Sequence, residues 1–383
     1  MYLTLVDLLL ATSILQSLVL AAFLLLPGAF RLVSNRLLAA SFLTFAAGLG
    51  EFFLYSTGLA LRYPNLAYLG TLIGLLQASL IYLYAKSLMY RDFRLRPRHA
   101  MHSLLFWVVS AIFLVEYYLQ PMEMKLHILQ GRDHPGVLTS PLLAIAIHMV
   151  FLGYLWATIR AINRFGTTVR QLFSNLENKQ LAWLRTLLIL YAIVWTISLL
   201  YCLSAHVFTD IVSPRAVSAI GAIAGCLFVN YLLIHALRQP DIFSGLSAEE
   251  TRFAESEVKA SGAEPDGVDT ALLQRLKTHM AEARPYLDAD LTVDQLARQL
   301  GIPTRDLSRV INEGLEKNFF ELVSDYRIAE VRRQLEKAEA GSTILQVMYD
   351  SGFNSKSVFN TAFKKATGMT PSAYRARRAK SSG

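Results

Sequence analysis

Charged side chains are scarce in this chain. Asp, Glu, Lys and Arg make up 17% of its 383 residues, whereas soluble domains contain about a quarter. The scarcity lies almost wholly before residue 238, and the whole chain is 54% hydrophobic. The length allows two or three domains. Composition therefore excludes an ordinary water-soluble domain over the first 237 residues and permits one after them.

Cysteine is rare, and recognisable catalytic motifs are missing. The two cysteines, Cys202 and Cys226, both fall in apolar stretches, which excludes a disulfide framework and favours a packing role. The sequence has no Walker loop, no G-x-G-x-x-G, no clustered Cys and His residues and no nucleophile motif. It therefore predicts no catalytic residue, no metal site and no cofactor, and we do not expect an enzyme.

Long hydrophobic runs, by contrast, are abundant before residue 238. Each has about 19–25 residues, enough to cross a hydrocarbon core of about 30 Å as a helix. A buried helix of a soluble protein would be shorter and amphipathic. The first run is not a cleaved signal peptide, because it lacks a basic n-region and the first positive residue is Arg31. Seven transmembrane helices are therefore predicted, at roughly 3–26, 37–60, 65–89, 101–119, 138–160, 181–204 and 214–237.

The loops between these runs differ in positive charge. If the N-terminus is outside, the cytoplasmic loops hold ten Lys and Arg residues, four of them in the stretch 91–98, and the outside loops hold four. Positive residues concentrate on the cytoplasmic side of membrane proteins. We therefore expect the N-terminus outside and, after an odd number of spans, the C-terminal domain in the cytoplasm.

A few polar side chains lie within the predicted spans. Glu51 and Glu116 fall in the outer half of the bilayer, and Gln77 and His148 fall near its middle. Polar and ionisable groups are costly there and are usually functional or paired inside the bundle. These four are the candidate ligand-sensing residues. The alternative is that each is hydrogen-bonded within the bundle or, for Glu116, reaches interfacial water.

The composition changes after Pro240. Residues 241–268 contain Ser, Gly, Ala and acidic residues without a sustained apolar period. This pattern predicts a juxtamembrane segment and a flexible linker over 239–268. A flexible linker of that length would typically reach about 30 Å.

Acidic residues are absent after Asp350, where seven basic residues follow. Residues 352–378 read GFNSKSVFNTAFKKATGMTPSAYRARR. A glycine turn precedes a helix with apolar residues at helical spacing, and Gly368 and Pro371 end that helix. The pattern is typical of the second half of a helix-turn-helix motif, whose second helix enters the major groove of DNA.

A similar pattern lies upstream. Thr292 is a plausible N-cap for a helix ending at Gly301, and Pro303 is placed to begin the next helix. On that helix Leu307 is expected to face the core and Ser308 to lie outward. Arginine can donate two hydrogen bonds to guanine, so Arg305 and Arg309 are the best candidates for reading bases. The alternative is that either of them contacts only a phosphate. The candidate DNA-binding residues are Arg305, Ser308, Arg309, Lys356, Ser357, Asn360, Lys364, Lys365 and Arg375, of which the last three are expected on phosphates.

A predicted helix at 319–337 joins the two motifs. Nineteen helical residues span about 28 Å, close to the 34 Å of one turn of B-DNA. One chain could therefore place two recognition helices in successive segments of the major groove.

These C-terminal motifs resemble the AraC/XylS family of bacterial transcription regulators. The resemblance covers roughly residues 270–378 and departs from many members at Thr361, where they have Arg. It implies double-stranded DNA and RNA polymerase as partners. The spans are similar to those of a membrane-embedded subgroup of this family. The similar residues are IYLYAKSL at 81–88, His102 and WLRTLL at 183–188.

Together these patterns predict an all-α protein in three parts. Residues 1–238 would form a seven-helix transmembrane sensor, 239–268 a juxtamembrane segment and linker, and 269–383 a double helix-turn-helix DNA-binding domain. The expected protein is a one-component regulator of the bacterial inner membrane that contacts the lipid bilayer and an unknown small-molecule or envelope signal; a homodimer is left open. The alternative is a membrane receptor or transporter whose C-terminal module is a protein-interaction or autoregulatory domain.

Overall fold

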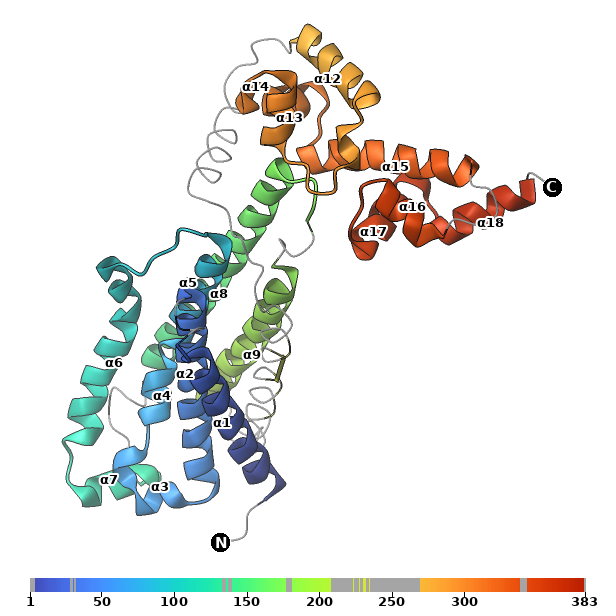
Figure 1. Ribbon diagram of the computed structural model, residues 1–383. Coiled ribbons are helices and arrows are strands. Elements are labelled where there is room, and N and C mark those ends of the chain that lie inside the picture. Colours follow the sequence, from blue (N-terminus) through green and yellow to red (C-terminus); the bar gives the residue numbers. More distant parts are fainter. Residues whose placement is uncertain are drawn as a thin grey trace. The chain divides into compact units, whose positions relative to one another are not determined.

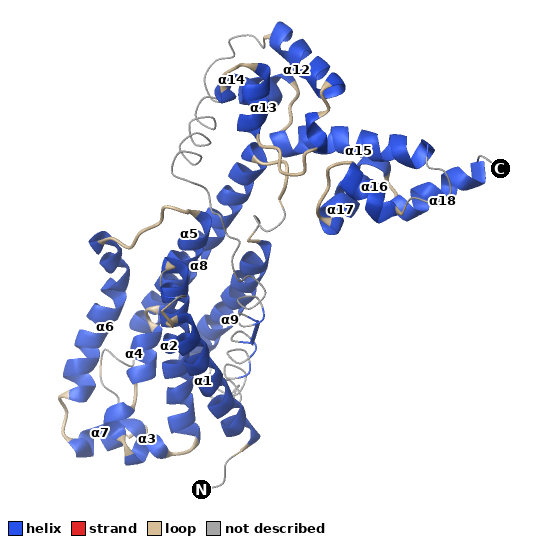
Figure 2. Ribbon diagram, in the orientation of Figure 1, coloured by secondary structure: helices blue, strands red, loops and turns tan. Residues whose placement is uncertain are grey.

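Every element in the described part of the chain is helical (Figures 1 and 2). The computed structural model describes residues 4–27, 32–132, 140–176, 181–207, 269–337 and 343–381, and a few isolated positions between them. The chain forms two compact units. Unit 1 comprises Met1–Ile162 and Ala182–Ile242, and unit 2 comprises Asn163–Leu181 and Phe243–Gly383.

Unit 1 contains long apolar helices. Five of them are long and apolar enough, by length and composition, to cross a membrane, and they overlap the first five predicted spans, although the fifth continues to Leu172 instead of ending near residue 160. The sixth predicted span is the helix α9 (Ala182–Val207), whose apolar part is the shorter Trp183–Ile193. The seventh, at 214–237, lies outside the described residues. The five long spans are Leu5–Leu24, Val33–Ser56, Pro64–Met89, Pro97–Tyr118 and Pro141–Leu172.

Two of these spans are less regular than the sequence predicts. The third contains α4 (Leu69–Gly74) and α5 (Gln77–Met89), and the two residues between them keep right-handed helical backbone angles. The fourth begins as a 3₁₀ helix (Pro97–Ser103), continues as α6 (Leu104–Phe113) and ends in a π-helical turn (Leu114–Tyr118). The spans predicted at 65–89 and 101–119 are therefore present as candidate spans, but each is built from more than one helical segment.

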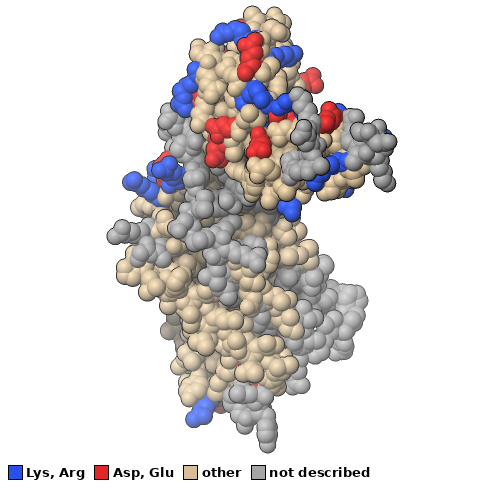
Figure 3. All heavy atoms as spheres, turned by 45° about the vertical axis from the view of Figure 1, so that its right-hand side comes forward, with Lys and Arg blue, Asp and Glu red and all other residues tan. Residues whose placement is uncertain are grey.

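The helix α2 (Val33–Ser56) is the centre of packing in unit 1. It packs against α1 (Leu5–Leu24), α4 and α5. Other helices of the unit expose large apolar side chains, among them Trp107 and Trp156, and the face of the unit in Figure 3 is nearly free of charge. Exposed apolar surface of this extent is unfavourable in water and is what a helix needs in lipid.

Unit 2 contains two short helix pairs joined by the long helix α15 (Phe319–Lys337). The first pair is α13 (Val293–Leu300) and α14 (Thr304–Arg309), preceded by α12 (Thr270–Glu282). The second pair is α16 (Ile344–Asp350) and α17 (Lys356–Thr367), followed by α18 (Pro371–Ser381). Charged side chains of both signs gather on this unit (Figure 3). The helices predicted at 293–300 and 319–337 have the observed bounds.

One glycine allows α4 to approach α2 closely. A Cβ atom built on Gly70 would lie 2.3 Å from the carbonyl oxygen of Ala47 and 2.7 Å from the Cβ of Glu51, whereas one built on Gly74 would meet nothing within 4 Å. Gly70 and Gly74 therefore have different roles, because only Gly70 lies against the backbone of α2.

We predict that Gly70→Ala destabilises unit 1 and Gly74→Ala does not. Overpacking typically costs about 1–3 kcal/mol, so Gly70→Ala should lower the melting temperature of the detergent-solubilised protein by a few degrees. Gly74→Ala is the matched control, since it adds the same methyl group to the same helix. Equal melting temperatures for the two variants would contradict the close approach of α4 to α2.

Candidate nucleic-acid interface

The first helix-turn-helix motif is built by α13 and α14. Thr292 caps α13: its hydroxyl accepts from the backbone N–H of Gln295, and its own N–H donates to the Gln295 side chain, 2.7 Å away. Gly301 ends α13 in the left-handed conformation at φ +65°. Pro303 is the residue before α14 rather than its first residue. Leu307 and its apolar neighbours are buried, so the turn is fixed by packing as well as by its caps.

The helix α14 presents two of its three candidate residues to solvent. Arg305 and Arg309 are exposed, and Arg309 lies 3.8 Å from the Asp306 carboxylate in an exposed pair. Such a pair is weak and leaves the guanidinium able to bind another acceptor. Ser308 is only 7% exposed. The expectation that Ser308 lies outward is therefore wrong, because its small side chain fits into the packed side of the helix beside Leu307.

The second motif has an aromatic core. Phe353, Phe359, Phe363 and Tyr374 pack in one cluster with residues of α15 and α16. The Thr343 hydroxyl caps α16, and Gly368 ends α17 at φ +74°. This packing fixes the face that α17 turns to solvent.

That exposed face of α17 is polar and basic. Its first turn exposes Lys356, Ser357 and Asn360, and its last turn exposes Lys364 and Lys365. The ammonium of Lys365 lies 3.5 Å from the Glu321 carboxylate in an exposed pair.

Two neighbours of this face differ from it. Arg375, on α18, is half-buried. Thr361, where the AraC/XylS pattern often has Arg, donates its hydroxyl hydrogen to the carbonyl of Ser357. Thr361 therefore offers no long donor to a base, and the contact that an arginine would make there is absent.

A buried arginine on α15 connects the two motifs. The Arg327 side chain is 2% exposed and donates to the carbonyls of Tyr286 at 2.8 Å and Asp288 at 2.7 Å. Its guanidinium also lies 5.7 Å from the centre of the Phe353 ring. Burial lowers the pKa of Arg327 to about 10, and the nearby Asp288 opposes that shift. Arg327 therefore stays charged at neutral pH.

Gly352 brings the turn of the second motif against the same segment. A Cβ built there would lie 2.4 Å from the Tyr286 carbonyl oxygen and 3.0 Å from Nε of Arg327. The residue has φ +85°, a conformation that favours glycine. The Tyr286 backbone, the Arg327 guanidinium and the Gly352 turn therefore meet at one place. This contact fixes the arrangement of the first motif, α15 and the second motif.

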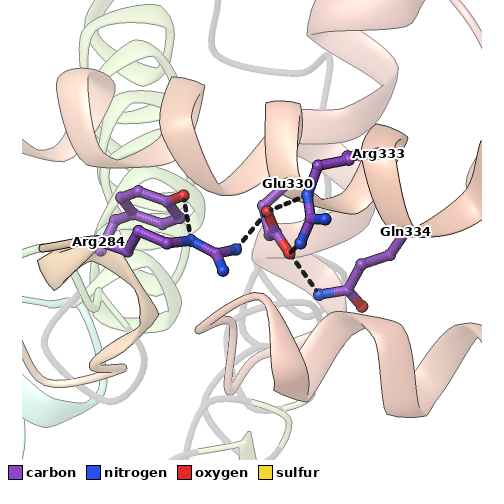
Figure 4. Close-up of polar contacts among 5 residues, drawn as sticks. Arg284, Glu330, Arg333 and Gln334 are labelled. Atoms are coloured by element: carbon purple, nitrogen blue, oxygen red, sulfur yellow. Dashed lines mark hydrogen bonds and ion pairs between the residues drawn. The ribbon is translucent and has the colours of Figure 1, made fainter. Parts of the chain in front are cut away.

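A second polar cluster holds α15 to the segment after α12. Glu330 is buried and accepts from Arg333 and Gln334 on its own helix and from Arg284, whose guanidinium is 2.5 Å away (Figure 4). The Arg284 guanidinium also donates to the Tyr286 hydroxyl at 3.0 Å (Figure 4). The hydrogen bonds from Arg333 lower the pKa of Glu330 to about 2, although burial opposes them. The carboxylate is therefore ionised at every physiological pH.

Sequence reasoning missed Arg327. Arg332 and Arg333 on the same helix are exposed, and polarity alone gives no reason to separate Arg327 from them. The available signal was its position: Val323 and Val331, four residues before and after it, are both buried. An arginine on the apolar stripe of a helix must find buried hydrogen-bond acceptors.

The four candidate sensing residues do not meet at one site in the described structure. Glu51 accepts from the backbone N–H of Thr71 at 2.5 Å and from its hydroxyl at 2.9 Å. Gln77 accepts from the Thr44 hydroxyl and is buried. His148 lies 2.7 Å from the Ala144 carbonyl through Nδ1 and packs edge-on against Trp195.

Of the four, Glu51 lines a cleft. The cleft holds about 360 Å³ between α2 and the start of the third span, and Leu66, Leu69 and Gly70 are also in its lining. Glu116 is half-buried in the π-helical turn and is not among the residues lining this cleft. The neighbouring Tyr117 and Tyr118 hydroxyls donate to the carbonyls of Pro64 and Ala67 instead of pointing free groups into a pocket.

A family model described as a helix-turn-helix domain matches residues 296–377. No curated protein and no solved structure matches the chain. The matched range begins in α13 and ends in α18, so it contains both motifs and the α15 helix between them. This match supports the resemblance to the AraC family at the C-terminal end. Residues 296–377 therefore form a helix-turn-helix domain, and the resemblance to the AraC/XylS family rests on this part of the chain.

Proposed function

We propose that this protein is a membrane-embedded, one-component transcription regulator. Unit 1 would sense a small molecule or an envelope condition, and unit 2 would bind specific double-stranded DNA. The observation that carries the proposal is the pair of exposed, basic helix faces on α14 and α17, held together by a buried arginine between them. The helix-turn-helix match supports DNA as the partner. RNA polymerase is a further partner that the family resemblance implies.

The rival function is a receptor or transporter whose C-terminal module binds a protein. The cores of protein-binding faces are depleted in lysine and enriched in aromatic residues, methionine and arginine. The chain after Asp350 instead contains seven basic residues and no acidic one, which suits phosphates. The regulator is therefore the better supported of the two functions.

The candidate residues divide into base readers and phosphate contacts. Arg305 and Arg309 are exposed on a short helix that can enter the major groove, where a guanidinium can donate to guanine O6 and N7. Lys364 and Lys365 lie in the last turn of α17 and would bind phosphates, which set register and affinity without reading bases. The nineteen residues of α15 separate the motifs by about one turn of B-DNA.

We predict that Arg309→Ala and Lys365→Ala weaken DNA binding in different ways. On a duplex selected by the wild-type chain from a random pool, Arg309→Ala should cost about 1–3 kcal/mol and relax the preference at one base pair. Lys365→Ala should weaken all sequences alike and reduce the salt dependence by about one counterion. The measurement is a titration of fluorescent duplexes with the full-length protein in nanodiscs at several salt concentrations.

Arg298→Ala is the control for this comparison. Arg298 is an exposed arginine of α13 that pairs with Asp294 and lies outside the candidate interface, so its replacement should leave affinity unchanged. If Arg309→Ala and Lys365→Ala give the same profile across sequences, the division into base reader and phosphate contact is wrong.

The proposed location is the bacterial inner membrane, with the N-terminus outside and unit 2 in the cytoplasm. The excess of Lys and Arg in the loops assigned to the cytoplasm supports this orientation. It is also the orientation that DNA binding requires.

A reporter active only in the cytoplasm should work when fused after Lys380 and fail in the 121–136 loop. A reporter active only outside should show the reverse pattern, because the two positions lie on opposite sides in the proposed topology. Immunoblotting of the fusions controls for expression. External activity after Lys380 would place unit 2 away from the chromosome and rule out the regulator.

We place signal recognition within unit 1, at the cleft beside Glu51. The carboxylate already binds Thr71 across two helices, so a ligand that competes for it would change how α4 lies on α2. Since Glu116, Gln77 and His148 are not in the lining of this cleft, they become secondary candidates for ligand contacts.

Glu51→Gln should reduce the response of a target promoter at least tenfold across envelope conditions, because the neutral amide cannot supply the negative charge that would attract a cationic signal. Glu123→Gln, at an exposed position, is the matched control, and Glu116→Gln tests the second carboxylate. Membrane level and DNA affinity are measured for each variant. A full response in Glu51→Gln would remove this residue from signal recognition.

A further inference from the structure

The helix α8 takes part in both units. It runs without interruption from Pro141 to Leu172, and its residues belong to unit 1 up to Ile162 and to unit 2 from Asn163 onward. The part in unit 2 keeps a buried apolar stripe: Phe165, Val169 and Leu172 recur at helical spacing and are all buried. This end of α8 is therefore packed protein rather than an exposed overhang.

The three residues after α8 pair with the start of the first helix-turn-helix motif. We call residues 173–175 the docking segment. Phe173 and Thr292 form an antiparallel bridge, and the backbone N–H of Ser174 donates to the Leu291 carbonyl at 3.2 Å. The Asn175 amide donates to the Asp290 carboxylate at 3.0 Å. The pairs 173 with 292 and 175 with 290 share one antiparallel register, so the contact is one isolated bridge extended by a side-chain hydrogen bond.

The buried arginine of α15 holds the same segment. Arg327 donates to the carbonyl of Ser174 at 3.2 Å and to its hydroxyl at 3.1 Å. The Ser174 hydroxyl in turn donates a hydrogen bond to the Leu291 carbonyl at 2.6 Å. Ser174 is 1% exposed, so these groups cannot exchange their partners for water while the segment stays in place.

One guanidinium therefore binds the docking segment and the segment 286–289 at once. The second motif shares the contact, because a Cβ built on Gly352 would lie 3.0 Å from Nε of Arg327. Displacement of Ser174 would leave two donated hydrogen bonds of a buried cation unmade, which buried polar groups rarely tolerate. The arrangement of the two motifs is thus linked to whether the docking segment is seated.

We propose that the docking segment is the regulatory contact through which unit 1 controls the two DNA-binding motifs. Its partner surface is the Leu291 edge of the first motif together with Arg327. A signal that rotates or shifts α8 within unit 1 is carried along the continuous helix to Ser174, and it favours the seated or the released segment. This proposal rests on the proposed function, and it assigns the control of that function to α8 rather than to the 239–268 linker alone.

Cross-linking in membranes tests the contact itself. Asn175→Cys and Asp290→Cys are placed in a chain with Cys202→Ala and Cys226→Ala, and a protease site is inserted between residues 260 and 265. Residues that face each other in an antiparallel pair are close enough for a disulfide. After mild oxidation and cleavage, most of the protein should run as one joined species that separates on reduction. The control pair, Asn175→Cys with Ser372→Cys on α18, should stay separate.

A second variant tests the regulatory role. Ser174→Leu places a large apolar side chain against Arg327 and should release the segment, so that cross-linking of the 175–290 pair falls at least fivefold. Target-promoter output in cells should differ at least threefold from wild type. Thr167→Leu, an exposed position of α8, is the matched control and should change neither quantity. Affinity of the full-length protein for the selected duplex is measured in parallel.

The outcomes separate this proposal from the proposed function. Loss of DNA binding in the wild type itself would remove the function. Normal DNA binding with no cross-link in the 175–290 pair would overturn the docking contact. A formed cross-link with unchanged promoter output in Ser174→Leu would overturn its regulatory role. The variant with cysteines at 175 and 290 keeps the native Ser174 and Arg327. Its cross-linking result is therefore independent of any folding defect that Ser174→Leu causes.

Discussion

The arrangement of the DNA-binding part depends on one buried cation. Arg327 is 2% exposed, and a guanidinium carries five N–H donors that must be satisfied where water is excluded. The acceptors come from segments far apart in the chain: the carbonyls of Tyr286 and Asp288, and Ser174 after α8. Because a buried charge without partners is very costly, the side chain fixes where these segments lie. The second motif adds its glycine turn to the same point through Gly352.

The two units differ in the solvent they suit. Unit 1 turns large apolar side chains such as Trp107 outward and keeps several polar groups paired inside, Glu51 with Thr71 among them. Unit 2 carries charge outward and aromatic side chains inward. Under the proposed function, one chain would both respond at the membrane and act on DNA. The helix α8 contributes residues to both units.

The sequence was sufficient for features that depend on local chemistry. The capped helix at 293–300, the nineteen-residue α15 and the glycine end of α17 all follow from caps, spacing and turn residues. It was insufficient where tertiary packing decides. Ser308 is polar but small enough to be buried. Arg327 is charged but buried among hydrogen-bond acceptors from distant segments, and the sequence around Arg327 does not predict those acceptors. The segment that follows α8 has only the pattern of a basic loop after the 138–160 span, although its Ser174 pairs with a residue more than a hundred positions away.

The central proposal is that this protein binds specific chromosomal DNA through its two helix-turn-helix motifs. The most direct measurement is genome-wide recovery of DNA cross-linked to the full-length protein in living cells. The recovered fragments should share a motif with two half-sites about one helical turn apart, and a chain with Arg305→Ala and Arg309→Ala should lose that enrichment. Fragments with no shared motif, or equal enrichment from the double variant, would contradict the claim.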